Sequence, residues 1–395
     1  MKDTVLILGG AIWSENLFKA LQQIGLRIML TDINPDSPMR KYADEFYNVS
    51  AEDSNEILNI ISGNERIIIA YCGGDFATRS ALSINQELLK KKIVNENPDI
   101  FIDKVKMKEF FKKANIKTPE GEVISRNSKI LEKIHYPRIF KPIGLSGARG
   151  VEVINSYEDS IRYFEKYKYD SVLNEEIAYG TQHDVNGFFV DGNFYPAGLS
   201  DRFFSLEPIY PLYGYSPSVL EVQTQNKIYE SLKEVGIAAG IDTGPIKGDV
   251  FVSNERNVVY NEIGFRFHGD ITSCIVLPNT GRHFPFLEYL SKLAPQYDKM
   301  IQQYYKSIYR KKQTIRWDII RFSPGIFKGI QGMDKIASRS DLLEIILRKK
   351  KGDLLKGPYD NSDMLGYFLT ANSSHVACEQ SANEIHNNLK VEVDV

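Results

Sequence analysis

The sequence predicts an α/β protein of two or three domains, each with its own hydrophobic core. In the first hundred residues, short apolar strands alternate with amphipathic helices, a pattern typical of a parallel sheet. Further along, strands rich in β-branched and aromatic residues are joined by polar turns, a pattern that favours antiparallel hairpins. A chain of 395 residues is long enough to build this number of cores.

Composition and charge exclude several classes of function. The chain is 43% hydrophobic and 25% charged, as in an ordinary globular protein, and its net charge of −2 gives no general attraction to nucleic acid. We find neither an apolar run that could span a bilayer nor a leader with a cleavage site. Cys72, Cys274 and Cys378 are far apart and odd in number, which favours a reducing compartment. We therefore expect a cytoplasmic protein that binds neither nucleic acid nor membrane.

The N-terminal unit follows a Rossmann-like pattern. The strand Val5–Leu8 is followed by a Gly-Gly turn, a helix and a second strand that ends at Asp32. Asp32 could hold a ribose, but the third glycine of the dinucleotide fingerprint is missing, so we assign no nucleotide here. The buried strand Ile67–Tyr71 leads to Asp75, which either faces a ligand cleft or caps the next helix.

A glycine-rich loop, Gly144 to Gly150, follows the short strand Arg138–Phe140. Glycines three positions apart let successive backbone N–H groups turn inward and form a nest for phosphate oxygens. The loop matches neither the P-loop nor the nucleophile elbow, and a flexible hairpin tip is the alternative. Lys141, directly before the loop, shifts the interpretation towards phosphate.

The stretch Gly244–Gly269 predicts a hairpin with one acid on each strand. Antiparallel pairing about the polar turn 254–256 brings Asp249 and Glu262 near each other. Two carboxylates on a rigid ribbon attract Mg²⁺, and Arg266 offers a planar donor for phosphate or carboxylate. Taken alone, this stretch fits an edge hairpin with two solvated acids better than a metal site.

The motifs taken together resemble the ATP-grasp superfamily, especially the carboxylate–amine ligases related to carbamoyl phosphate synthase large subunits and L-amino acid ligases. Their order is a lysine that opens a helix, Lys-Pro with a Gly-rich loop, a strand with Glu-Glu-Ile, and an acidic hairpin with Glu-Ile-x-x-Arg. The resemblance covers nearly the whole chain. It implies a Rossmann-like pre-ATP-grasp domain (1–100), an ATP-grasp domain of two α+β subdomains (101–300, with a lid at about 120–185) and a small C-terminal α/β module (301–395).

The resemblance also implies a role for each matched residue, with ATP and Mg²⁺ (or Mn²⁺) as cofactors. Arg266 and Lys141 are implied to be catalytic. The implied nucleotide-binding residues are Lys104, Lys141, Ser146, Gly147, Gly150, Glu175, Glu176, Ile177 and Gln182. Asp249 and Glu262 are the implied metal ligands. Candidates for substrate contact, by position, are Asp75, Arg202, Ser216 and His268, the second and third of which lie in an aromatic- and proline-rich segment, 201–220.

Two positions depart from the family pattern. Gln182 stands where many members have a ribose-binding glutamate, and Gly264 stands where many have an asparagine metal ligand, so one coordination position passes to water or substrate. The implied activity is ADP-forming ligation of a small-molecule carboxylate to an amine through an acyl phosphate, and a homodimer is left open. A Rossmann oxidoreductase and an ATP-binding protein with regulatory or altered chemistry are the alternatives.

Overall fold

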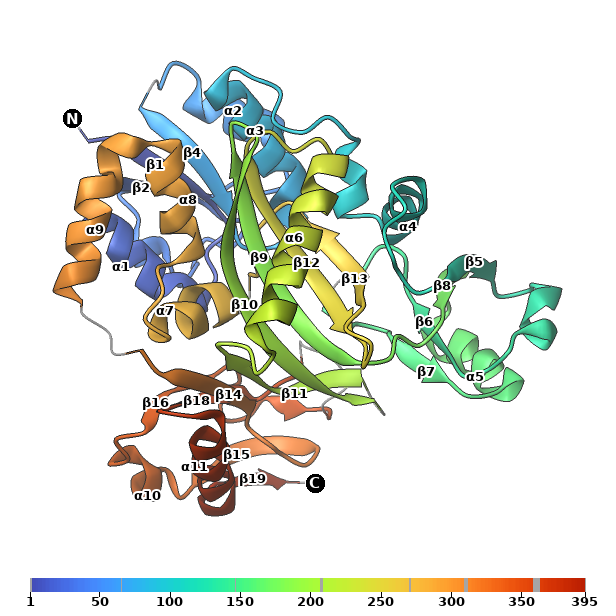
Figure 1. Cartoon of the computed structure of the whole chain (residues 1–395). Helices are drawn as coiled ribbons and strands as arrows, with labels where there is room; N and C mark the ends of the chain where they lie inside the picture. Colours follow the sequence, from blue (N-terminus) through green and yellow to red (C-terminus); the bar gives the residue numbers. More distant parts are fainter. Residues whose placement is uncertain are drawn as a thin grey trace.

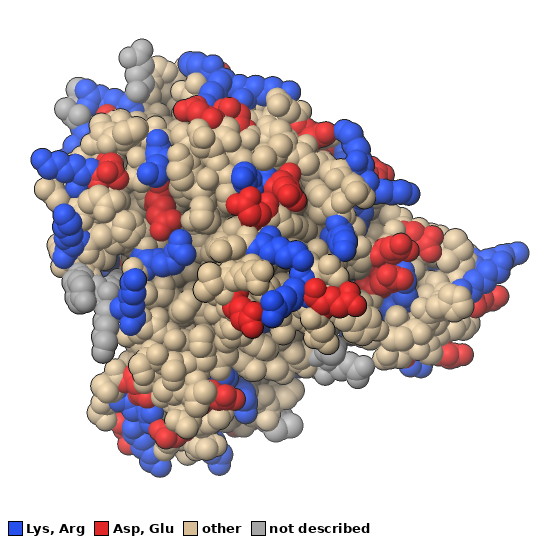
Figure 2. All heavy atoms as spheres, viewed as in Figure 1, with Lys and Arg blue, Asp and Glu red and all other residues tan. Residues whose placement is uncertain are grey.

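The computed structural model describes residues 2–64, 66–145, 147–206, 209–269, 271–308, 312–357 and 363–394. It confirms the α/β fold class, with a parallel N-terminal sheet, a large antiparallel sheet, a small sheet that projects to one side and a C-terminal layer (Figure 1). Lysines, arginines and acids are interspersed over the face shown in Figure 2, without a patch of a single sign. No helix in the described ranges has both the length and the apolar character needed to cross a membrane.

The N-terminal sheet has the strand order β3-β2-β1-β4, with every pairing parallel. Its elements are β1 (Thr4–Leu8), α1 (Glu15–Gln23), β2 (Arg27–Thr31), β3 (Glu45–Tyr47), α2 (Ser54–Ile61), β4 (Ile67–Cys72) and α3 (Thr78–Leu89). Asp32 accepts the Gly10 N–H at 2.9 Å and the Asn34 N–H at 2.9 Å, so it stabilises the turns around the first strands. The carboxyl end of β4 leads into the loop that carries Asp75.

The small projecting sheet, which we call the lid sheet, has the order β5-β8-β6-β7. It consists of β5 (Gly121–Ser125), β6 (Arg138–Lys141), β7 (Glu152–Ile154) and β8 (Ser171–Glu175), with α5 (Tyr157–Tyr167) packed beside it. Phe140, Tyr163 and Phe164 form its buried core. Helix α4 (Lys104–Lys113) precedes it and is capped by the Asp103 carboxylate, which accepts the N–H groups of Val105 and Lys106.

The large sheet has the order β13-β12-β9-β10-β11-β14-β18-β16. Its first part comprises β9 (Thr181–Val190), β10 (Asn193–Leu206), β11 (Ile209–Ser216), β12 (Gly244–Val252) and β13 (Val258–Gly264). Neighbouring residues of β9 point to opposite faces, so Phe189 packs with α6 (Val222–Ala238), whereas Phe188 packs with α8 (Pro285–Leu293). Val252 of β12 pairs with Val258 of β13 across the turn of this hairpin.

The C-terminal strands continue the large sheet across the expected boundary at residue 300. Strands β14 (Thr314–Ile319), β16 (Leu342–Leu347) and β18 (Gly366–Asn372) join it through the pairing of β14 with β11. A second sheet is formed by β15 (Gly325–Gln331), β17 (Leu354–Leu355) and β19 (Lys390–Asp394). The remaining helices are α7 (Leu277–Asn279), α9 (Asp298–Ser307), α10 (Met333–Ala337) and α11 (His375–Asn388). The division into three domains stays a prediction.

Candidate active site

A cavity of about 830 Å³ opens between the loop after β4, the lid sheet and the large sheet. Most of the residues expected to form a site line it. They are Asp75, Lys104, Lys141, Gly147, Glu175, Glu176, Ile177, Gln182, Arg202, Asp249, Glu262, Arg266 and His268. Ser146 lies outside the described residues. Sequence positions that are up to 193 residues apart therefore share one cavity.

Two expected site residues do not line this cavity. Gly150 has a φ of +68°, which favours glycine, and its carbonyl accepts the Tyr163 hydroxyl at 2.6 Å. It therefore anchors the end of the loop to α5, beside the lid sheet. Ser216 is buried at the end of β11, where its hydroxyl donates to the Leu199 carbonyl over 3.4 Å. The structure thus gives Ser216 a place in the sheet and not at the cavity wall.

The carboxylate of Glu175 binds two lysines. Lys108, which sequence reasoning missed, lies 2.5 Å from it, and Lys141 contacts its other oxygen. Burial alone would raise the pKa of Glu175, but the two ammonium groups outweigh burial and lower it. The implied contact of Glu175 with the nucleotide stays a prediction, whereas its contact with Lys141 is direct. Lys141 also donates to Asn261 at 2.8 Å, so a residue of β13 helps to orient it.

Lys104 reaches the glycine-rich loop, where its ammonium donates to the Leu145 carbonyl. Burial lowers the pKa of Lys104, and the nearby Glu262 carboxylate opposes that effect. Lys104 and Lys141 thus reach the cavity from two different elements, α4 and β6. Such an arrangement suits the oxygens of a polyphosphate.

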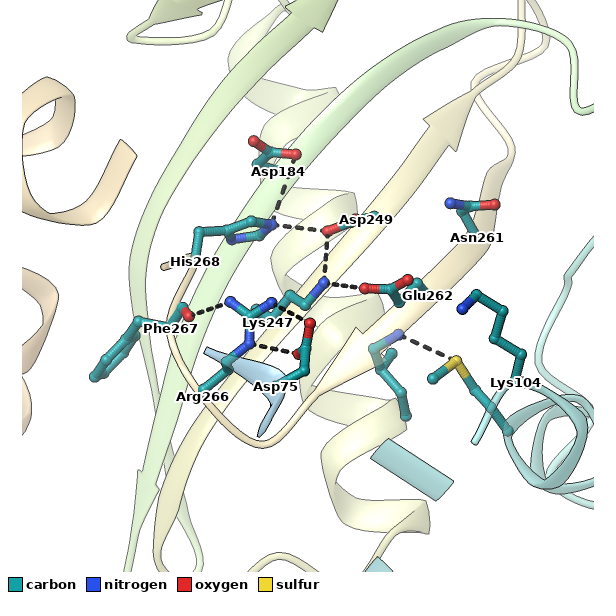
Figure 3. A network of polar contacts seen from close by, with 12 residues as sticks. Asp75, Lys104, Asp184, Lys247, Asp249, Asn261, Glu262, Arg266, Phe267 and His268 are labelled. Atoms are coloured by element: carbon teal, nitrogen blue, oxygen red, sulfur yellow. Dashed lines mark hydrogen bonds and ion pairs between the residues drawn. The ribbon is translucent and has the colours of Figure 1, made fainter. Parts of the chain in front are cut away.

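The acid pair is formed as expected, but a third residue stands within it (Figure 3). Asp249 and Glu262 are direct partners in the ladder between β12 and β13. The ammonium of Lys247, which sequence reasoning missed, lies 3.2 Å from Asp249 Oδ1 and 2.5 Å from Glu262 Oε1. Burial alone would lower the pKa of Lys247, but the two carboxylates outweigh burial and raise it. The spacing of two along β12 was the available signal, because it puts Lys247 and Asp249 on one face.

Arg266 is fixed by an acid from the N-terminal unit. Its Nε and Nη2 donate to the two oxygens of Asp75 at 2.6 and 2.9 Å, and its Nη1 donates to the Phe267 carbonyl at 2.9 Å. Burial alone would lower the pKa of Arg266, but Asp75 outweighs burial and raises it. Of the two roles left open for Asp75, the structure shows the one at the cleft, and this pair joins the first sheet to the hairpin (Figure 3).

A second polar cluster adjoins the acid pair. His268 Nε2 lies 2.8 Å from Asp249 Oδ1 and 3.6 Å from an oxygen of Asp184, which in turn pairs with Arg202. The backbone N–H of His268 donates to Asn186 Oδ1 at 2.9 Å, and His268 Nδ1 lies 3.1 Å from the same atom. Sequence reasoning missed Asp184, although it lies two positions after Gln182 on β9 and its side chain is therefore on the same face of the strand.

The donor set fits a hard divalent cation. The carboxylates of Asp249 and Glu262 lie on adjacent strands, and both residues line the cavity. The hydrogen bonds found among the described residues use Oδ1 of Asp249 and Oε1 of Glu262, which leaves Oδ2 and Oε2 for a cation. Asp184, Asp249 and His268 also place one donor atom each within 4.8 Å of one another. Oxygen ligands on a rigid ribbon are what Mg²⁺ prefers.

This fold and this cavity define a class: the chain has the fold of the ATP-grasp ligases, which confirms the resemblance drawn from the motifs. Within it, residues 319–394 match the family model for L-amino acid ligase C-terminal domain 2. The structure is similar to that of an L-amino acid ligase from Bacillus licheniformis, with 17% identity and a TM-score of 0.78 over 100% of this chain and 99% of that one.

Two further relatives are similar over most of this chain. A carboxyaminoimidazole ribonucleotide synthase from Aspergillus clavatus, solved in complex with ATP, is 15% identical and has a TM-score of 0.72 over 98% of each chain. The carbamoyl phosphate synthase large chain of Clostridium botulinum is 23% identical over 296 residues, which are 71% of this chain and 26% of that protein. The chain therefore spans about a quarter of the length of that relative.

Proposed function

We propose that this protein joins a carboxylate to an amine in a reaction that converts ATP to ADP and phosphate. The observation that carries the proposal is one cavity that brings together the two lysines at the glycine-rich loop, an acid pair and a fixed guanidinium. The C-terminal match and the similarity to an L-amino acid ligase support an amino acid or a similar carboxylate as the first substrate.

The chemistry follows from the poor reactivity of a carboxylate. An amine does not displace oxide from carboxylate at neutral pH, so the oxygen must first become a better leaving group. Transfer of the γ-phosphoryl group of ATP to a carboxylate oxygen gives an acyl phosphate and ADP. The amine nitrogen then attacks the acyl carbon, the C–O bond breaks, phosphate leaves, and the nitrogen loses a proton. Phosphoryl transfer needs mainly positioning and charge neutralisation.

The chain supplies these needs from separate elements. Lys104 and Lys141 would hold phosphate oxygens beside the loop. Arg266, whose fork is oriented by Asp75, would stabilise charge on the transferring group. Asp249 and Glu262 would hold Mg²⁺, which supplies charge neutralisation at the phosphates when bound.

A second candidate is an ATP-binding protein of the same fold with altered or regulatory chemistry. One observation favours it: the ammonium of Lys247 stands between the two carboxylates that would bind the metal. An ammonium at that place neutralises part of the charge of the same two carboxylates and so weakens their attraction for a metal cation. This candidate predicts that nucleotide binds although no pair of substrates releases ADP.

The experiment that separates the two is a screen of amino acids, alone and with amines, for Mg²⁺-dependent ADP release. Release that requires both a carboxylate and an amine supports the ligase. Nucleotide binding by calorimetry without ADP release from any pair supports the second candidate, and failure to bind nucleotide contradicts both. The matched control is the double variant Asp249→Asn/Glu262→Gln, which should lose turnover while its circular dichroism spectrum stays that of the folded protein.

A further inference from the structure

Lys247 occupies the centre of the acid pair. It lies two residues before Asp249 on β12, and its ammonium contacts one oxygen of Asp249 and one of Glu262 at 3.2 and 2.5 Å (Figure 3). The residue is only 2% exposed, so water screens these contacts little. A positive charge is therefore already in place where two carboxylates would otherwise face each other.

The space for this side chain comes from Gly264. Lys247 and Gly264 are direct partners in the ladder between β12 and β13. A Cβ atom added to Gly264 would lie 2.9 Å from Cε and 3.3 Å from Cγ of Lys247. Any larger residue at 264 would thus displace the Lys247 stem, and the two residues form a matched pair that puts the ammonium between the acids.

We propose that Lys247 is a resident cation of this centre, and that the protein consequently binds one divalent cation with its nucleotide and not two. The inference rests on the proposed nucleotide site. The ammonium of Lys247 contacts Oδ1 of Asp249 and Oε1 of Glu262, and His268 contacts the same Asp249 oxygen. Oδ2 of Asp249 and Oε2 of Glu262 therefore remain for one ion. A second divalent ion would have to lie a few ångströms from the ammonium, where like charges repel strongly in a poorly hydrated site.

A purely structural ion pair would leave the number of metal ions unaffected, so that number is the decisive readout. Mn²⁺ bound to the full chain can be counted by electron paramagnetic resonance in the presence of a non-hydrolysable ATP analogue. The wild type should bind one Mn²⁺ per chain, and Lys247→Met should bind two. Lys108→Met is the control, because it removes a lysine from the same cavity that pairs with Glu175 instead, and it should stay at one.

Lys247→Met leaves two acids without their cation and could fail to fold. The double variant Lys247→Met/Gly264→Asn fills the same space and offers an amide oxygen, and it should also bind two Mn²⁺. Two Mn²⁺ in the wild type, or one in either folded variant, overturns the proposal. A titration of Mn²⁺ into the protein without nucleotide tests the role of Lys247 independently of the proposed function. Lys247→Met, which lacks the ammonium, should bind Mn²⁺ about tenfold or more tightly than the wild type does. Unchanged affinity there contradicts the role of Lys247 even if nucleotide does not bind.

Discussion

Asp75→Asn should destabilise the protein by about 2–3 kcal/mol and slow turnover. The change removes the charge that Arg266 faces and one of two charge-assisted hydrogen bonds, each of which contributes about 1.5–3 kcal/mol. The side chain of Arg266 is 10% exposed and that of Asp75 is 23% exposed, so water replaces the lost contact only in part. Urea unfolding of wild type and variant measures the difference in the free energy of unfolding.

The pKa of Asp75 determines how the difference in the free energy of unfolding depends on pH. Burial alone would raise the pKa of Asp75, but Arg266 outweighs burial and lowers it. A lowered pKa gives stability that is present above the ordinary value of 3.8 and is lost as the pH falls below it. The cost of Asp75→Asn should therefore stay constant between pH 5 and pH 8.

Asp99→Asn is the matched control for this prediction. Asp99 pairs with Arg79, whose side chain is 61% exposed, and also contacts Lys106 at the surface. Exposed pairs contribute roughly 1 kcal/mol or less. If Asp75→Asn costs no more than Asp99→Asn, the contact between Asp75 and Arg266 does not join the two parts of the protein as we infer.

The remaining predictions concern three other residues. Burial raises the pKa of Glu288 to about 7, so the stability that its protonated form contributes at low pH is lost as the pH rises through 7. In urea unfolding, Glu288→Gln should therefore be more stable than the wild type by at most about 3 kcal/mol at pH 8 and nearly equal to it at pH 4.5. Arg266→Lys keeps the charge but loses the fork, so kcat should fall at least tenfold while the KM for ATP changes little; equal changes would contradict a role in the transfer step. Glu175→Gln leaves two lysines without their acid, so binding of an ATP analogue should weaken several-fold by calorimetry; unchanged affinity would show that Glu175 does not orient Lys141.

Local patterns were sufficient to predict the acid pair because a turn sets the register of its hairpin. Pairing of Val252 with Val258 alone would put Asp249 opposite Asn261. The register shift after Asp249 supplies the remaining residue and brings Glu262 opposite. The sequence pattern therefore predicted the neighbourhood of the two acids, and the irregularity in the ladder makes them direct partners.

Residues whose role depends on a distant partner could not be predicted in this way. Lys247 looked like an ordinary strand residue, since only the glycine opposite it explains where its ammonium lies. Lys108 could not be assigned to the site because its partner, Glu175, lies on another element, 67 positions away. Ser216 was expected at the cavity by its position in the segment 201–220, but it ends β11, where its hydroxyl is buried. The pairing of β14 with β11 likewise depends on contacts about a hundred residues apart.

The central claim, ligation through an acyl phosphate, is tested most directly by following carboxylate oxygen. A carboxylate substrate identified by the ADP-release screen would be labelled with ¹⁸O in its carboxyl group and allowed to react with ATP and the amine. The account predicts ADP as the nucleotide product and one ¹⁸O atom in each released phosphate, because the bond between the acyl carbon and that oxygen breaks. AMP as the product, or phosphate without label, would contradict it.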